Sequence, residues 1–147
     1  MGFGVWHLKN LMALHLRNNG LMQKLKTFTR YLLGVLFMAA GINHFWHTAF
    51  YVSMMPPYLP LHLELVYLSG LAEIGLGALL FLTRWQRLAA WGVIALCIAV
   101  FPANVNMALH PELFPQFSAQ GLWLRLPLQA VAIAWAWWYT RRPARRC

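Results

Sequence analysis

The sequence predicts an all-α integral membrane protein, a bundle of four transmembrane helices with both chain ends on the cytoplasmic side. Its composition supports this class, because 61% of the 147 residues are hydrophobic and only three residues are acidic, against twelve Lys and Arg. A soluble domain of this size normally carries far more charge. The apolar residues form long runs rather than alternating or one-sided patterns, so lipid should surround most of the chain.

Four apolar stretches account for the expected helices. Each is close to the ~20 residues that a helix needs to cross the ~30 Å hydrocarbon core. They cover about residues 29–50, 65–83, 88–109 and 121–140. The connection at 83–87 is short and polar, whereas those at 47–64 and 110–120 are longer, contain proline and lack Lys and Arg.

Charge sets the expected orientation, because Lys and Arg near the ends of membrane helices stay on the cytoplasmic side. Basic residues precede the first helix, fill the second connection and follow the fourth helix, so four spans place them all on one side. They are Lys24, Lys26, Arg30, Arg84, Arg87, Arg141, Arg142, Arg145 and Arg146. Since they cluster at helix ends and not among polar, aromatic-bearing loops, nucleic acid is not an expected partner.

Three segments are expected along the chain. Residues 1–26 form a basic amphipathic segment whose apolar stretch is too short and too polar to span a membrane. We interpret it as an interfacial helix on the membrane surface, with a poorly ordered extension as the alternative. It has no small-residue cleavage site of the kind that ends a secretory signal peptide. The transmembrane domain covers 27–141, and a basic cytoplasmic tail covers 142–147.

Two kinds of site do not fit the sequence. Cys97 lies inside an apolar run, Cys147 lies in the tail, and there is no C-x-x-C motif. A quinone-linked disulfide-forming enzyme needs paired thiols that can exchange, which argues against that class. Histidines and glutamates lie near the external connections, but neither H-E-x-x-H nor a Cys/His ligand pair is present, so no metal site is predicted.

Polar side chains within the apolar runs are few and collect in one layer. Burying such groups in hydrocarbon costs free energy, so they normally face the bundle interior or a water-filled cavity. They often belong to a functional site. Counted at ~1.5 Å per residue from the outer helix ends, they lie about 6–12 Å deep. The candidates for ligand binding or proton handling are His44, Glu73, Asn104, Arg125 and Gln129. We predict a shared polar pocket that opens toward the external face; its catalytic residues, if any, are not identified.

Glu73 and Arg125 are the expected ion pair of this layer, because an isolated charge there is costly. The pair either ties two helices together or binds a polar head group and carries protons. Four more residues are expected at the pocket rim, namely Asn43, Tyr51, Tyr58 and Asn106. The apolar segment 51–60 is too rich in proline for a helix, and we expect it to lie on the membrane surface, as a cap on the pocket or as an anchor.

Small residues and one proline predict local features of the helices. Gly34 and Gly41 share one face of the first helix, and Gly70 and Gly77 share one face of the second. Small residues at such spacing let helices approach closely. Pro102 lies inside the third helix, where it frees a carbonyl group and should produce a kink beside the pocket.

Several motifs occur in an order and spacing that resemble the DoxX-like family of small bacterial integral membrane proteins. They are 41–45 (GINHF), 55–60 (MPPYLP), 67–73 (YLSGLAE), 101–108 (FPANVNMA) and 123–129 (WLRLPLQ). The resemblance covers about residues 27–141, without the N-terminal extension and the basic tail. It implies a four-helix fold in the bacterial cytoplasmic membrane. It also marks the five residues that the depth argument selects.

The family is named after a subunit of a thiosulfate:quinone oxidoreductase, so the resemblance implies a redox-linked, quinone-associated membrane subunit. The alternative is an accessory or assembly subunit that stabilises a larger membrane complex without chemistry of its own. The sequence has no flavin, haem or iron–sulfur signature. We therefore expect no intrinsic cofactor but a bound quinone. The expected partners are the lipid bilayer and other membrane subunits, and one of these subunits carries the electrons.

Overall fold

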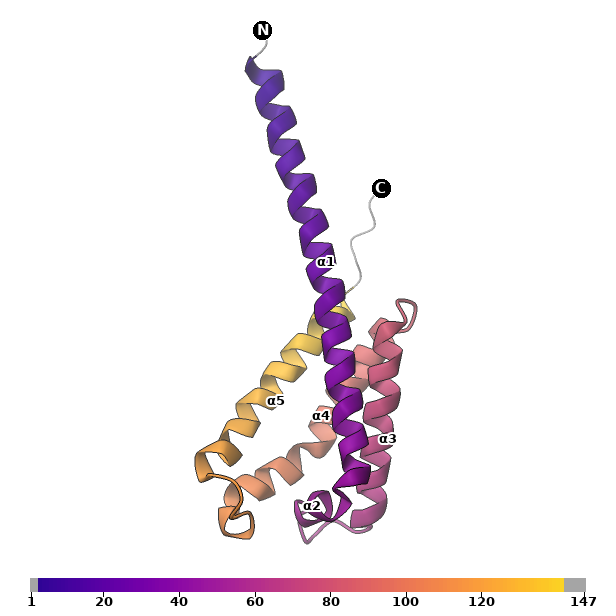
Figure 1. Ribbon diagram of the computed structural model, residues 1–147, viewed down its shortest axis with the longest axis vertical. Helices are drawn as coiled ribbons and strands as arrows, with labels where there is room; N and C mark the ends of the chain where they lie inside the picture. Colours follow the sequence, from indigo (N-terminus) through magenta and orange to yellow (C-terminus); the bar gives the residue numbers. More distant parts are fainter. Residues whose placement is uncertain (1–2, 142–147) are drawn as a thin grey trace.

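The computed structural model describes the backbone of residues 3–141 and the side chains of residues 18 and 20–141. The basic tail expected at 142–147 lies outside the described residues. Within the described part the protein is all-helical, as predicted (Figure 1). The helices are α1 (Phe3–Trp46), α2 (Thr48–Ser53), α3 (His62–Phe81), α4 (Gln86–Leu109) and α5 (Ala119–Thr140), with a 3-10 turn, η1 (Pro111–Leu113).

Three of these helices are long and apolar enough to cross a membrane. They are α3, α4 and the Gly20–Trp46 part of α1. This confirms the coarser prediction of a helical protein with membrane-type segments. At 22 residues α5 is also long enough, but Arg125, Gln129 and its tryptophans make it less apolar, so a fourth span stays a prediction.

The N-terminal segment and the first apolar run form one helix, which differs from the predicted division. α1 is continuous from Phe3 to Trp46, with no boundary near residue 26, and its N-terminal part projects beyond the rest of the bundle (Figure 1). The reason lies in the sequence, because no proline occurs before Pro56 to interrupt the helix. The position of this segment on a membrane surface stays a prediction.

The segment after α1 also contains more helix than predicted. α1 ends at Trp46, and after His47, whose backbone is not helical, the chain forms α2 over Thr48–Ser53. Part of the segment 51–60 is therefore helical, because its prolines begin only at Pro56. The connection ends at Leu61, which has a left-handed backbone with φ 57°.

Glycines bring the backbones of α1 and α3 into contact, as the small-residue spacing suggested. The two helices run antiparallel and side by side (Figure 1). A Cβ atom placed on Gly41 would lie 2.5 Å from the carbonyl oxygen of Gly70, and one on Gly34 would lie 2.8 Å from that of Gly77. No side chain fits between these positions, so the glycines fix how α1 sits against α3.

Two apolar clusters flank the middle of the bundle. The larger is built on α1, α3, α4 and α5 and includes Leu33, Leu80, Val93 and Tyr139. The smaller lies under the connections and contains Met54, Met107, Phe114 and Leu122. On α4 and α5, the residues that line the pocket described below lie between members of the two clusters.

Replacement of Gly41 by alanine tests the glycine contact. We expect Gly41→Ala to lower the free energy of unfolding by about 1–3 kcal/mol, because an added methyl group must push the helices apart. Gly75→Ala is the matched control, since a Cβ on Gly75 meets no atom within 4 Å and alanine favours a helix. The measurement is the thermal midpoint of the purified protein in detergent. Equal midpoints for the two variants would show that the contact does not stabilise the fold.

Candidate functional site

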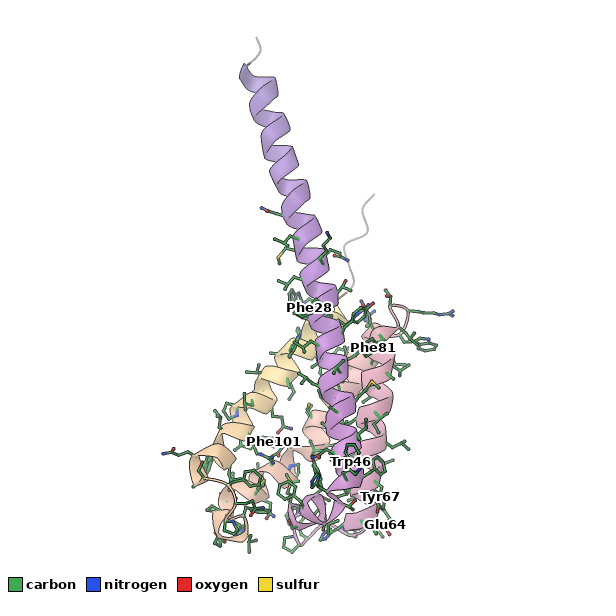
Figure 2. All side chains as sticks on the ribbon, viewed as in Figure 1. Phe28, Trp46, Glu64, Tyr67, Phe81 and Phe101 are labelled. Atoms are coloured by element: carbon green, nitrogen blue, oxygen red, sulfur yellow. The ribbon has the colours of Figure 1, made fainter. Side chains whose placement is uncertain are left out.

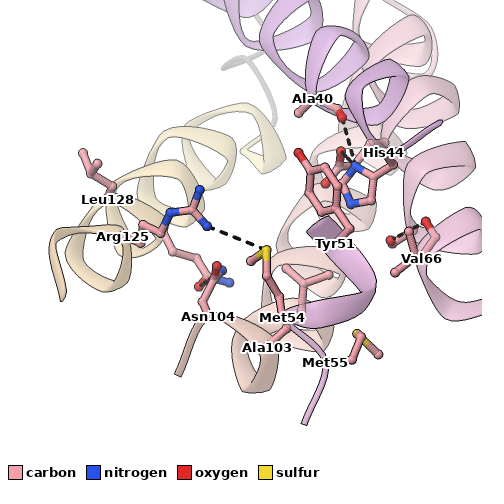
Figure 3. A pocket seen from close by; sticks show the side chains of 14 residues that line it. Ala40, His44, Tyr51, Met54, Met55, Val66, Ala103, Asn104, Arg125 and Leu128 are labelled. Atoms are coloured by element: carbon pink, nitrogen blue, oxygen red, sulfur yellow. Dashed lines mark hydrogen bonds and ion pairs between the residues drawn. The ribbon is translucent and has the colours of Figure 1, made fainter. Parts of the chain in front are cut away.

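A pocket of about 310 Å³ lies where α1, α3, α4, α5 and the residues after α2 meet (Figure 3). It brings together all five residues that the sequence singled out as ligand-binding or proton-handling candidates. They are His44, Glu73, Asn104, Arg125 and Gln129. The remaining wall is mostly apolar, with Val66, Val100 and Leu128 among its residues. A mostly apolar concavity with a few polar groups is the usual form of a small-molecule site.

One wall carries an imidazole and a carboxylate from the two helices that the glycines hold together. His44 lies one turn beyond Gly41, and Glu73 lies one turn beyond Gly70. Nδ1 of His44 is 2.9 Å from the carbonyl oxygen of Ala40 and 3.4 Å from Oε2 of Glu73. A carbonyl oxygen only accepts, so Nδ1 carries a proton and donates it to Ala40. Oε2 of Glu73 is buried and has no hydrogen-bond partner among the described residues.

Tyr51 covers this wall from the side of α2. Its ring stacks on the ring of His44, with centroids 3.7 Å apart and planes inclined by 23° (Figure 3). Nδ2 of Asn43 donates to the Tyr51 hydroxyl over 2.9 Å. Nδ2 of Asn106 donates to the carbonyl oxygen of Met54 over 3.2 Å. Asn43 and Asn106 therefore hold the covering segment from two sides.

The four predicted rim residues have different positions. Tyr51 lines the pocket. Asn43 and Asn106 do not line it, but they donate hydrogen bonds to the segment that covers it. Tyr58 does not line the pocket; its side chain is 73% exposed and borders a separate hollow with Pro102 and Asn106.

A second wall is formed by amide groups on α4 and α5. Nδ2 of Asn104 donates to Oε1 of Gln129 over 3.1 Å, and Nε2 of Gln129 donates to the carbonyl oxygen of Cys97. Cys97 lies five residues before Pro102, next to Ile98, whose carbonyl group loses its helical partner because proline has no N–H. The second half of α4 diverges from α3 toward the start of α5 (Figure 1). Gln129 thus donates to a backbone carbonyl group beside the expected proline kink.

Among the described residues Arg125 has no carboxylate partner, and the predicted Glu73–Arg125 ion pair is wrong. Nη1 of Arg125 lies 3.0 Å from Sδ of Met107 and 4.0 Å from Sδ of Met54. Its guanidinium carbon is also 5.7 Å from the centre of the Phe117 ring. Thioether sulfur is a weak acceptor. The physical reason is that α4 and α5 diverge here from α1 and α3 (Figure 1). The two charged groups therefore lie on different walls, and Oε2 of Glu73 lies near Nδ1 of His44, at 3.4 Å, without a hydrogen bond between them.

Met54 and Met107 are site residues that the sequence reasoning missed. Met107 lies three residues after Asn104, so helical spacing could have placed both on one face of α4. Met54 follows the short helix α2, and no periodic signal predicts its direction. Within the part of the chain that the structure describes, no group of three or more His, Cys, Asp or Glu could hold a metal ion.

The pocket therefore offers different chemistry on its two sides. The unpartnered oxygen of Glu73 can accept a hydrogen bond, and the guanidinium of Arg125 can donate several. Apolar side chains lie between them. This arrangement suits a small amphiphile whose polar ring or head group reaches both sides.

The fold and the pocket define a class, a helical protein of membrane type with a ligand-sized pocket inside its bundle. The chain belongs to the family described as Domain of unknown function (DUF8561), which matches residues 33–140. No curated protein and no solved structure matches the chain. The matched range runs from α1 to the last residue of α5, so it contains every residue that lines the pocket.

Removal of the Gln129 amide tests whether this residue supports the pocket wall. We expect Gln129→Leu to lower the free energy of unfolding by about 1–3 kcal/mol, because the Cys97 carbonyl and the Asn104 amide lose their partner. Gln120→Leu, at an exposed position of the same helix, is the control and should leave stability nearly unchanged. Thermal unfolding in detergent measures both variants. A Gln129→Leu protein as stable as the control would mean that the amide network contributes nothing.

Proposed function

We propose that this protein is a DoxX-like, redox-linked membrane subunit that binds a quinone in the pocket between its four long helices. The observation that carries the proposal is a carboxylate and a guanidinium on different walls of one mostly apolar pocket. Oε2 of Glu73 is buried with no hydrogen-bond partner among the described residues, and Arg125 has weak partners there, thioether sulfurs and an aromatic ring. A bound ligand can offer both groups stronger hydrogen bonds.

The two walls match the two redox states of a quinone. An oxidised quinone has carbonyl oxygens that accept hydrogen bonds from Arg125 and Asn104. The reduced form has hydroxyl groups, one of which donates to Glu73. The apolar residues between the walls contact the ring, and the quinone tail extends along the helices toward lipid.

Quinone reduction takes up two electrons and two protons to give the hydroquinone. In this proposal Glu73 and His44 pass the protons, and Arg125 orients the ring. The sequence has no flavin, haem or iron–sulfur signature, so a partner subunit supplies the electrons.

The same proposal includes four spans, with both termini in the cytoplasm of a bacterial cell. α5 supports this as the fourth span, because it buries Leu122, Gln129 and Tyr139 and exposes apolar side chains on its other side. These exposed residues include Trp123, Leu124, Val131 and Trp137. An apolar outer surface on a helix of 22 residues suits lipid. The basic residues at helix ends support the orientation.

An accessory or assembly role is the second candidate. The observation that favours it is the N-terminal part of α1, which projects beyond the other helices (Figure 1). In that role the projecting helix docks a larger complex, and the polar pocket only stabilises the bundle. Co-purification with a defined membrane complex that persists after mutation of the pocket supports this candidate over the quinone site.

Quinone retention tests the main proposal. The wild-type protein, extracted in its native lipid, should carry quinone that mass spectrometry detects and that accepts electrons from a chemical reductant. We expect Arg125→Ala to lower retention of the quinone, and Glu73→Gln to lower retention of the hydroquinone, by about tenfold each, the effect of losing one charge-assisted hydrogen bond. Arg87→Ala, an exposed arginine outside the pocket, should behave like the wild type. Unchanged retention and reduction in both pocket variants would contradict the proposal.

Reporter fusions test the topology. We expect a fluorescent protein fused after Arg84 or after Arg141 to fluoresce, because both positions are cytoplasmic in the proposed arrangement. Alkaline phosphatase fused after Phe117 should be active, since it would be exported. An active phosphatase after Arg141 would mean that α5 does not cross the membrane.

A further inference from the structure

A second polar site lies at the other end of the bundle, where α3 and α5 end and α4 begins. We call this the basic end; its described basic residues are Lys24, Lys26, Arg30, Arg84, Arg87 and Arg141. Arg30 is the unusual member, because it is only 4% exposed. Its Nη1 donates to Oε1 of Gln86, and its Nη2 donates to the Thr83 hydroxyl over 3.3 Å. Its Nε is buried and has no partner among the described residues.

No carboxylate of the described chain neutralises this buried guanidinium. The sequence has three acidic residues, Glu64, Glu73 and Glu112. Glu73 lies on α3, yet it precedes the end of that helix at Phe81 by eight residues, about 12 Å. The closest compensation is the Tyr31 ring, whose centre lies 5.1 Å from the guanidinium carbon. Burying a charge without an opposite charge costs free energy. An anion bound beside Arg30 would reduce this cost.

A cavity of about 220 Å³ adjoins Arg30 and also includes Lys26, Thr83, Gln86 and Tyr139 in its wall. The Lys26 ammonium lies 5.8 Å from the centre of the Trp138 ring and 5.9 Å from that of Tyr139. The Tyr139 hydroxyl is held by Thr29 at 2.7 Å. The wall therefore presents two cations and several hydrogen-bond donors in positions fixed by neighbouring side chains.

We infer that this cavity binds a phosphate group, held by Arg30 and Lys26. Guanidinium and ammonium groups with nearby hydroxyls are the donors that phosphate oxygens accept from. The surroundings favour the head group of a phospholipid as the source. Tyr31, which also lines the cavity, stacks on Phe81 with ring centres 5.1 Å apart, and both rings are partly exposed. Together they offer an apolar surface beside the cavity for an acyl chain.

This site is independent of the quinone proposal. The larger apolar cluster, which includes Leu33, Leu80 and Val93, lies between it and the pocket. No residue lines both cavities. A test of the phosphate site is therefore independent of the chemistry proposed for the pocket.

Lipid retention by the full-length protein tests the inference. The wild-type protein, delipidated in detergent, is titrated with phosphatidylglycerol and analysed by native mass spectrometry and thermal unfolding. We expect one tightly held lipid and a raised thermal midpoint. A galactolipid with the same acyl chains lacks phosphate and should give neither effect. Inorganic phosphate, compared with chloride at equal ionic strength, reports binding of the free anion.

Variants connect any effect to the cavity. Arg30→Lys and Lys26→Gln should each weaken phosphatidylglycerol retention about tenfold, as expected for one lost charge-assisted hydrogen bond. Lys26 is only partly buried, so Lys26→Gln gives a folded test protein even if Arg30→Lys does not fold. Arg84→Gln, an exposed change at the same end, should retain the lipid.

The outcomes separate the sources of the phosphate. Retention of phosphatidylglycerol that Lys26→Gln weakens and Arg84→Gln does not supports the site with a lipid as its source. Stabilisation by inorganic phosphate alone, lost in the Lys26→Gln variant, supports the phosphate site and overturns the lipid source. Equal binding of galactolipid and phosphatidylglycerol, or equal behaviour of Lys26→Gln and Arg84→Gln, overturns the inference.

Discussion

The backbone contact between α1 and α3 is the constraint on which the pocket depends. Because the two helices run antiparallel, Gly41 packs against Glu73 and Gly70 packs against His44: an added Cβ would lie 2.9 Å from the Cβ of Glu73 in the first case and 2.8 Å from that of His44 in the second. The side chains of His44 and Glu73 extend beside this contact and come within 3.4 Å of each other. The glycines thus determine the height and the direction of the polar wall. A larger residue at either position would separate the imidazole from the carboxylate before it changed any polar group.

The second general feature of the structure is positive charge without a nearby carboxylate. Arg125 and Arg30 lie at opposite ends of the larger apolar cluster, and the described residues offer neither of them a carboxylate. Each is instead surrounded by weaker partners: sulfur atoms and an aromatic ring for Arg125, neutral oxygens and an aromatic ring for Arg30. With only three acidic residues in the whole chain, few carboxylates are available to balance the basic residues.

The sequence predicted the helices well, because long apolar runs have few alternatives to a helix. It also predicted which polar residues share a layer, since the rise per residue fixes height along a helix. Height does not fix lateral separation, which explains why Glu73 and Arg125 were wrongly paired although both line the pocket. The role of Met54 depends on how α2 folds over the site, and the continuity of α1 depends on the absence of a helix breaker. Neither leaves a periodic pattern.

The uninterrupted course of α1 has a consequence for the two cavities. Arg30 and His44 lie on one helix, separated by fourteen residues, or about 21 Å. The helix contacts α3 at Gly34 and Gly41, between these two residues, and its N-terminal part projects beyond the bundle (Figure 1). One continuous helix therefore forms part of both walls, with Arg30 beside one cavity and His44 beside the other.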